Sequence, residues 1–358
     1  MSQFWSKRTQ ALSPYVPGEQ PKDTRYIKLN TNENPYPPSA TVQQAIQAAS
    51  GDALRLYPDP NADELKQAIA NYYHVDRQNI FVGNGSDEVL AHAFVALLKH
   101  DKPLLYPDIS YSFYPVYSKL FGINEKQIPL DNNFAINIDD YQQDNGGIIF
   151  PNPNAPTGKA ISLITIEKLV EQHPHSVIAI DEAYVDFGAE SAIPLTKKYD
   201  NLLVIQTFSK SRSLAGLRVG FAIGSAVLIE GLERVKNSFN SYPLGREAIA
   251  GATASINDSE SFETSRQKII ESRTWTDEQL TNLGFVILPS QANFIFAKPP
   301  TGYTADILYQ QLKERNILVR YFNSARIDEY LRITIGTQEE MQALVTTLTD
   351  IFEQITYL

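Results

Sequence analysis

Lys210 is the residue of this chain whose sequence surroundings point most specifically to chemistry. It follows the apolar run LLVIQ (202–206) and stands beside Thr207 and Ser209, eight residues before Arg218. A lysine desolvated near other polar and cationic groups can keep its amine neutral and form a Schiff base with an aldehyde. The hydroxyls and the guanidinium are donors that suit a phosphate dianion. The segment therefore indicates a site for a phosphorylated aldehyde, although a surface lysine at a strand end accounts for the same residues.

Asp181 ends the apolar run VIAI (177–180), which is a costly place for a carboxylate without a cationic partner. A protonated pyridine nitrogen would be such a partner, and the pair would make the ring an electron sink for a carbanion at a substrate's α-carbon. Tyr184, three residues later, could donate its phenol to the ring's 3-oxygen. An aspartate that caps the turn after its strand is the alternative interpretation.

The segment GNGSDEVL (83–90) is typical of a glycine turn that opens a helix. Backbone N–H groups of Gly85, Ser86 and Asp87 would be free there to bind an anion. Acidic residues in the first turn also suit the helix dipole, so a well-capped helix explains the segment without a ligand. Because position 88 is Glu, the glycines do not form GxGxxG, and GxxxxGK[ST] does not occur, so the usual nucleotide-binding motifs are absent.

Hydrolase and metal chemistry are disfavoured by the residue types. Thr207 stands where the serine of an S-x-x-K hydrolase would be, and neither S-D-N nor K-T-G follows. The chain has no cysteine, which excludes disulfides and thiolate metal sites and is consistent with a reducing cytosol. His173 and His175 have no partner at a ligand spacing, so we expect solvated loop residues and no metal site.

Composition and charge limit the partners. Hydrophobic residues make up 43% of the 358 residues and charged residues 20%, as in globular proteins. The net charge of -10 argues against nucleic acid, whose phosphates need a concentrated basic surface. No signal peptide and no apolar run of membrane-spanning length is apparent. We expect a cytoplasmic protein that acts on small molecules.

The elements that must position these residues follow a strand–helix alternation from about residue 60 to 255. Strands are predicted at 79–83, 103–106, 147–150, 177–180, 202–208 and 219–224, and helices at 86–99, 112–121, 162–172 and 226–237. The strands are continuously apolar, which indicates a sheet covered on both faces. The pattern predicts an α/β fold with a mostly parallel sheet and helices on both faces. Ligands of such sheets bind beyond the carboxyl ends of the strands, where the motifs above stand.

The pattern changes after residue 256 to a polar-rich helix (259–282), short apolar runs, and helices at 303–315 and 337–355. This change predicts a smaller α+β domain. The first 35 residues contain prolines 14, 17, 21 and 35 and show no clear period, so we expect an extended arm rather than a helix. The predicted organisation is an N-terminal arm (1–35), a large domain (36–255) and a small C-terminal domain (256–358).

The motifs PNPNAPTG (151–158), DEAY (181–184) and TFSKSRSLAGLRVG (207–220), in this order, resemble the fold-type I aminotransferases that use pyridoxal 5′-phosphate (PLP). The segments KLNTNENPYPPS (28–39) and YLRITIGT (330–337) further resemble the histidinol-phosphate aminotransferase branch. The resemblance implies that Lys210 forms the Schiff base with PLP and then moves the substrate's α-proton. It also implies that Asp181 pairs with the pyridinium, Tyr184 binds the 3-oxygen and Tyr111 stacks on the ring.

The same resemblance assigns the phosphate and substrate contacts. The cofactor phosphate would be bound by Thr207, Ser209, Arg218 and the amides of Gly85, Ser86 and Asp87. Tyr57 would reach the phosphate of the neighbouring subunit, which makes a homodimer with shared active sites part of the mechanism. Arg332 would bind the α-carboxylate of glutamate, and candidates for the phosphate end of the other substrate are Tyr15, Asn32 and Arg320.

One position departs from the family pattern. Relatives usually carry Asn-Asn-Pro-Thr-Gly, in which the second asparagine binds the 3-oxygen, but that position is Ala155 here. Two alternatives follow. Either Asn154 replaces the missing donor in the cofactor site, or Tyr184 acts with less help.

The resemblance implies transfer of an amino group between L-histidinol phosphate and 2-oxoglutarate, which gives imidazole-acetol phosphate and glutamate in histidine biosynthesis. Three rivals remain: an aromatic amino-acid aminotransferase, a PLP-dependent threonine-phosphate decarboxylase, and a non-catalytic PLP-binding regulatory protein. The first would prefer aromatic acceptors, the second would release CO₂ without 2-oxoglutarate, and the third would not react with glutamate.

Overall fold

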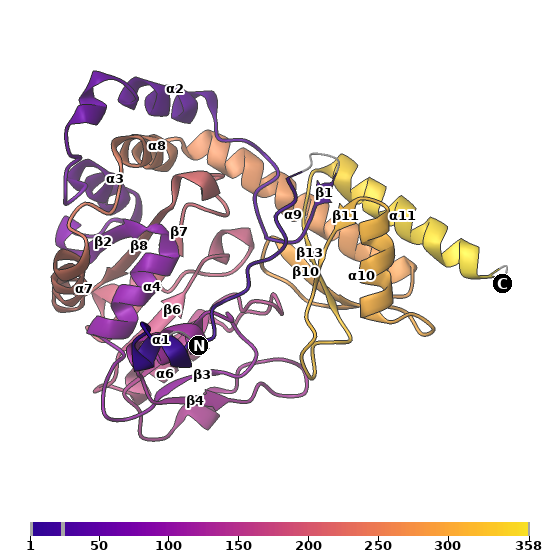
Figure 1. Ribbon diagram of the computed structural model, residues 1–358, viewed down its shortest axis with the longest axis horizontal. Coiled ribbons are helices and arrows are strands. Elements are labelled where there is room, and N and C mark those ends of the chain that lie inside the picture. Colours follow the sequence, from indigo (N-terminus) through magenta and orange to yellow (C-terminus); the bar gives the residue numbers. More distant parts are fainter. Residues whose placement is uncertain (1–2, 23–25, 357–358) are drawn as a thin grey trace.

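A seven-stranded sheet forms the centre of the larger part of the molecule (Figure 1), in a computed structural model that describes residues 3–22 and 26–356. Its strands are β2 (Ile80–Asn84), β3 (Leu104–Pro107), β4 (Glu125–Ile128), β5 (Gly147–Pro151), β6 (Ile178–Asp181), β7 (Leu202–Thr207) and β8 (Val219–Gly224). Their spatial order is β2-β8-β7-β6-β5-β3-β4, and β8 runs in the direction opposite to that of the other six strands. The predicted α/β fold with a mostly parallel sheet is confirmed.

The strands are continuously apolar because successive side chains enter two different cores. In β7, Leu202 and Val204 belong to the core on one face, whereas Leu203 and Ile205 belong to the core on the other. All four side chains are fully buried. A strand with both faces covered cannot show the polar alternation of a half-exposed strand.

Helices cover both faces of this sheet. Those of the larger part are α2 (Ala40–Ala49), α3 (Asp63–Tyr73), α4 (Gly85–Ala96), α5 (Tyr114–Phe121), α6 (Leu163–Gln172), α7 (Ala226–Phe239) and α8 (Arg246–Asn257). Helices α4, α5 and α7 share one apolar core with the strands, and α2, α3, α6 and α8 share the other. Short 3-10 helices lie at 52–55, 77–79, 138–141, 185–187, 193–197 and 215–217.

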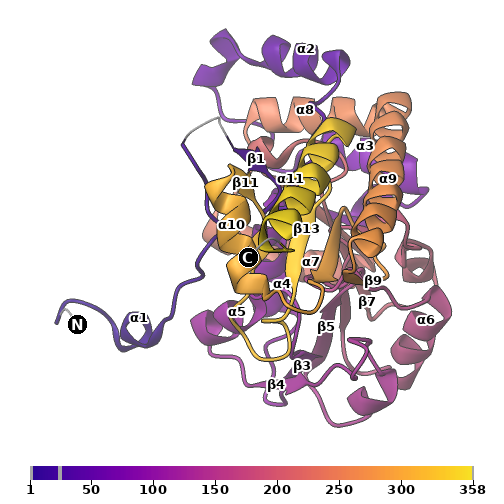
Figure 2. The ribbon, with the colours of Figure 1, turned by 90° about the vertical axis from the view of Figure 1, so that its right-hand side faces the viewer.

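The C-terminal part forms a second layered unit, in which helices pack on a smaller antiparallel sheet (Figure 2). The sheet order is β12 (Arg320–Tyr321), β13 (Leu331–Thr334), β10 (Phe294–Lys298) and β9 (Val286–Leu288). The helices are α9 (Ser259–Asn282), α10 (Ala305–Glu314) and α11 (Gln338–Thr356). The N-terminal β1 (Ile27–Lys28) pairs in parallel with β11 (Ile317–Leu318), so the segment after the arm is joined to this unit.

The prediction of an arm without helix is wrong for α1 (Lys7–Ala11). Ser6 caps this short helix by accepting a hydrogen bond from the Thr9 amide, and the helix ends before the first proline of the segment, Pro14. Figure 2 shows α1 on a segment that extends away from the body of the protein, and the guanidinium of Arg8 donates to the Lys119 carbonyl of the body.

In the described residues, 3–22 and 26–356, no helix has the length and apolar character required to cross a membrane. The same part of the chain contains no group of three or more His, Asp or Glu side chains arranged to hold a metal ion.

Candidate active site

Two cavities that share part of their lining lie at the carboxyl edge of the large sheet. The larger has a volume of about 820 Å³ and extends to the second unit, and the smaller has a volume of about 120 Å³. The smaller cavity is lined by Ser86, Asp87, Tyr111, Pro151, Ala155, Asp181, Ala183, Tyr184, Thr207, Ser209, Lys210 and Arg218. The structure thus brings together most of the residues that the sequence assigned to the cofactor.

Strand direction explains this convergence. Asp181 is the last residue of β6 and Thr207 the last residue of β7, and these strands are parallel, so both side chains lie at one edge of the sheet. Arg218 directly precedes β8, which runs the other way, so the start of β8 lies at the same edge. The single antiparallel strand therefore places an arginine among the carboxyl ends of parallel strands.

Lys210 is partly buried between the two units. Its Nζ donates a 3.0 Å hydrogen bond to the backbone carbonyl of Thr31 and lies 5.8 Å from the centre of the Tyr184 ring. Thr207 and Ser209 are buried beside it, and the Thr207 hydroxyl accepts from the Ser209 amide. Lys210 lines both cavities, and the Thr207 side chain holds the backbone of the residue that precedes this lysine.

Asp181 is a buried carboxylate without a cationic partner in the described chain. Tyr114 and the Ala183 amide each donate to it at 3.2 Å, and its side chain forms no ion pair with any described residue. Burial raises the pKa of Asp181 to about 6, against the lowering effect of these two hydrogen bonds. A buried carboxylate held in this way is suited to a ligand that supplies a positive charge.

The turn between β2 and α4 is packed tightly on Arg218. Gly85 has a φ of +78°, and a Cβ at this position would lie 2.4 Å from the Arg218 guanidinium. A Cβ on Gly220 would lie 2.3 Å from the Ser86 amide nitrogen. Only glycine permits both approaches, so the amides of the turn and the guanidinium are held as one group of donors.

Asp87 connects two of the assigned residues. Its carboxylate pairs with Arg218 at 3.0 Å and accepts a 2.8 Å hydrogen bond from the Tyr111 hydroxyl. Burial raises the pKa of Tyr111, so the phenol remains protonated and can donate. Asp87 therefore orients both the guanidinium and the ring that borders the smaller cavity.

Asn154 does not supply the donor that Ala155 lacks. Its amide donates to the Ile109 carbonyl at 3.0 Å and to the Thr157 hydroxyl at 3.1 Å, and Asn154 lines neither cavity. Ala155 itself lines both cavities. The Asn154 amide is thus held by Thr157 of its own loop and by Ile109 of the loop after β3, which argues against its replacing the donor that Ala155 lacks.

Asn32 lines the larger cavity, but its side chain has other partners than a substrate phosphate. Its amide nitrogen donates to the Tyr184 oxygen at 3.0 Å, and its carbonyl oxygen accepts from the Thr334 hydroxyl at 2.9 Å. Both side-chain polar atoms of Asn32 have partners within the protein and the residue is 1% exposed, which favours a structural role over contact with a substrate phosphate.

The remaining substrate candidates, Tyr15, Arg320 and Arg332, all line the larger cavity. Arg332 donates to the Asn30 carbonyl at 2.8 Å, while its Nε is buried and has no hydrogen-bond partner in the described chain. Burial lowers the pKa of Arg332. A buried guanidinium with a free donor is suited to a carboxylate ligand.

Tyr57 lies outside both cavities. Its side chain is 77% exposed and stacks on Tyr242 with ring centres 4.6 Å apart. Within residues 3–22 and 26–356, the Tyr57 side chain makes no direct hydrogen bond or ring contact with the residues assigned to the cofactor.

The sequence did not reveal two contacts of the site. Tyr114, which donates to Asp181, lies in an aromatic-rich segment that is also typical of core packing. The Thr31 carbonyl, which accepts from Lys210, is a backbone atom whose position leaves no signal in the sequence.

This fold and site define a class of protein. The chain belongs to the aminotransferase class I and II family, whose model matches residues 24–348. It is 60% identical to histidinol-phosphate aminotransferase 1 of Hydrogenovibrio crunogenus over 99% of both chains. It is 58% identical to histidinol-phosphate aminotransferase of Pseudomonas syringae over 98% of this chain and 100% of that one. Within the class, the chain therefore belongs to the histidinol-phosphate aminotransferase family.

The fold has a solved counterpart. The structure of histidinol-phosphate aminotransferase from Sinorhizobium meliloti in complex with pyridoxal-5′-phosphate matches with a TM-score of 0.88 and covers 99% of each chain. The two sequences are 22% identical, so this likeness shows the fold.

Proposed function

We propose that this chain is a PLP-dependent enzyme of histidine biosynthesis that transfers an amino group between L-histidinol phosphate and 2-oxoglutarate, giving imidazole-acetol phosphate and glutamate. The observation that supports the cofactor is the meeting of Lys210, Asp181 and Arg218 around one small cavity. The substrate follows from the relatives, which are 58–60% identical over nearly the whole chain and are named for histidinol phosphate.

The residues present fit PLP part by part. The Lys210 amine matches the aldehyde, and the unpaired buried carboxylate of Asp181 matches the pyridine nitrogen. Arg218, the buried hydroxyls and the glycine turn match the phosphate. Tyr111 borders the same cavity and suits the ring face.

When bound, PLP supplies an aldehyde for the amine and a ring that accepts electrons from the substrate's α-carbon. The chain's residues then hold and move protons. The Lys210 Nζ would take the proton from the substrate's α-carbon and deliver it to the carbon that was the cofactor's aldehyde. The Asp181 carboxylate would keep the ring nitrogen protonated, and the Tyr184 hydroxyl would donate to the 3-oxygen. Arg218 would bind the cofactor phosphate and Arg332 the α-carboxylate of the substrate. These two contacts would orient the α-proton toward Lys210.

A direct test of the substrate compares acceptors. We expect PLP-loaded protein, after reaction with glutamate, to prefer imidazole-acetol phosphate over phenylpyruvate in kcat/KM. A preference for phenylpyruvate would identify an aromatic aminotransferase instead. Release of CO₂ from threonine phosphate without 2-oxoglutarate would identify a decarboxylase.

Replacing Arg332 with alanine is expected to raise the KM for glutamate by roughly a hundredfold, because a bidentate charged contact of about 1.5–3 kcal/mol is lost. The measurement is steady-state kinetics with glutamate as the varied substrate. Arg234, an exposed arginine paired with Glu230, provides the matched control, and Arg234→Ala should leave the KM unchanged. An unchanged KM in Arg332→Ala would remove Arg332 from the substrate site.

The proposed functional unit is a cytoplasmic homodimer with shared active sites. Its support is the cluster of exposed apolar side chains around Tyr57, which includes Leu54, Leu56 and Tyr242. The neighbouring subunit's phosphate would give the Tyr57 hydroxyl a partner. Light scattering should give a molar mass of about twice 40.1 kDa, and Tyr57→Phe should weaken PLP retention by about tenfold, the loss of one hydrogen bond. A monomer with full PLP affinity would contradict this arrangement.

A further inference from the structure

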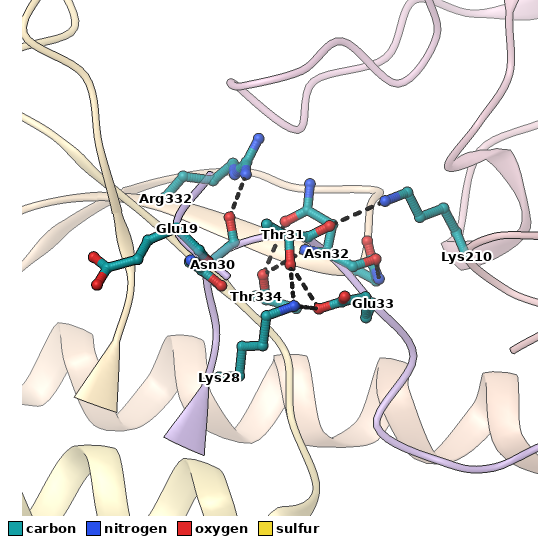
Figure 3. Close-up of polar contacts among 10 residues, drawn as sticks. Glu19, Lys28, Asn30, Thr31, Asn32, Glu33, Lys210, Arg332 and Thr334 are labelled. Atoms are coloured by element: carbon teal, nitrogen blue, oxygen red, sulfur yellow. Dashed lines mark hydrogen bonds and ion pairs between the residues drawn. The ribbon is translucent and has the colours of Figure 1, made fainter. Parts of the chain in front are cut away.

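A buried chain of hydrogen bonds connects the second unit to Tyr184 through the segment that precedes the large domain. Figure 3 shows Asn32 lying against Thr334 of β13. The side-chain amide of Asn32 also donates a 3.0 Å hydrogen bond to the hydroxyl of Tyr184. The Asn32 backbone amide also donates to the Thr334 hydroxyl at 3.0 Å. The Asn293 side-chain amide donates to the backbone carbonyl of Asn32 at 3.0 Å. Asn32, Thr334 and Asn293 are each at most 2% exposed, so water does not compete for these contacts.

The direction of these hydrogen bonds is fixed by the Thr334 hydroxyl. This hydroxyl already accepts from the Asn32 backbone amide, and the Asn32 side-chain oxygen is the acceptor of its single proton among the described residues. The side-chain nitrogen of Asn32 must then face Tyr184. If the amide were reversed, the Thr334 proton would have no acceptor there, which costs free energy in a buried site.

The Tyr184 oxygen therefore accepts a hydrogen bond, and its own proton is left for another partner. Tyr184 lines both cavities, and no described residue accepts its proton. Ala155, which lines the same cavity, offers no polar side-chain atom, and the Asn154 amide donates to the Ile109 carbonyl instead. Of the residues at positions 154, 155 and 184, Tyr184 therefore supplies the side-chain donor to the smaller cavity.

We propose that Asn32 and Thr334 are positioning residues that orient the Tyr184 hydroxyl so that its proton is donated to the 3-oxygen of PLP. This inference rests on the proposed function. It assigns Asn32 to the cofactor rather than to the substrate phosphate. It also connects the second unit to the cofactor, because Thr334 belongs to the sheet of that unit.

Two substitutions should reverse the direction of the hydrogen bond between residue 32 and the Tyr184 hydroxyl while Tyr184 itself is kept. In Asn32→Asp the introduced carboxylate can only accept, so it takes the Tyr184 proton. Asn32 has a φ of +58°, which aspartate also tolerates, so the backbone should be preserved. In Thr334→Val the hydroxyl that fixes the amide is absent, and the amide is free to turn its oxygen toward Tyr184.

The readout is the visible absorbance of PLP-loaded, substrate-free protein as a function of pH. A donor on the 3-oxygen stabilises its negative charge, so the adjacent nitrogen of Lys210 holds its proton less tightly. Loss of the donor should raise the midpoint of the titration by about one pH unit, the effect of one hydrogen bond to a charged group. We expect this rise in both Asn32→Asp and Thr334→Val, and a wild-type midpoint in Thr334→Ser, which retains the hydroxyl.

A double-substitution cycle separates this role from general damage. In a Tyr184→Phe background, Thr334→Val should cause no further change of the midpoint, because its effect acts through the Tyr184 hydroxyl. Asn32→Asp also introduces a charge, so the rise that remains in this background measures the direct effect of that charge. Wild-type midpoints in both single variants, or a further rise for Thr334→Val in the Tyr184→Phe background, would overturn the inference while the proposed function stands. A wild-type protein that takes up no PLP would overturn both.

Discussion

Replacing Lys210 with alanine is expected to lower the rate of amino transfer from glutamate by at least about a thousandfold. The substitution would remove the amine proposed to bond to the aldehyde and to move the α-proton, and general base catalysis alone contributes roughly 10²–10⁴-fold. Lys210 is the amine that lines both cavities, and the Thr31 carbonyl holds it at 3.0 Å. Single-turnover absorbance with glutamate measures the loss.

A lysine outside the site provides the control for this result. Lys298 pairs with Glu329 at the surface, so Lys298→Ala should react at the wild-type rate. Adding a small primary amine to Lys210→Ala should restore part of the proton transfer, because the emptied space at the cavity admits a base. A Lys210→Ala protein that turned over at the wild-type rate would refute the mechanism.

The second large effect is expected for Asp181→Asn. This substitution should lower the rate by between about a hundredfold and a few thousandfold, because a neutral amide replaces the carboxylate proposed to keep the ring nitrogen charged, and the proposed buried charge pair is lost. The Asn side chain retains the size of Asp and can still accept from Tyr114. The rate of the glutamate half-reaction and the dissociation constant of PLP are the measurements.

In the PLP-free protein, Asp181→Asn should raise the free energy of unfolding, although it lowers the rate of the PLP-loaded enzyme. Burial raises the pKa of Asp181 from 3.8 to about 6 in the folded protein, so folding with the charged carboxylate is penalised. This penalty is absent below pH 3.8, develops between pH 3.8 and 6 and is complete above pH 6. Denaturant unfolding without PLP should therefore show Asp181→Asn more stable than wild type at pH 8, with the difference shrinking near pH 5. A less stable variant at pH 8 would mean that the carboxylate has a structural partner.

The sequence predicted the parts of the site that depend on strand ends. Asp181 and Thr207 follow apolar runs of a mostly parallel sheet, and the topology of such sheets brings those ends together without knowledge of side-chain contacts. Most of the large sheet was predictable for the same reason, since each buried strand forms a continuous apolar run. The edge strand β4 has the sequence EKQI, with exposed positions, and did not give this signal.

The parts that the sequence did not predict depend on tertiary contacts. The role proposed for Asn32 rests on a hydrogen bond to Thr334, which is 302 residues away along the chain. The position of Asn154 follows from the carbonyl of Ile109, whose direction is a property of the folded loop. No local pattern reports on which of two neighbouring polar residues faces a cavity, so such assignments require the structure.

The most direct test of the central claim is the reaction of PLP-loaded protein with glutamate alone, followed by visible absorbance in a single turnover. The account predicts that the absorbance of the loaded protein is lost with the release of one equivalent of 2-oxoglutarate per chain, and that imidazole-acetol phosphate restores it. An absorbance that glutamate leaves unchanged, in protein that has taken up PLP, would contradict the assignment of this chain as an aminotransferase.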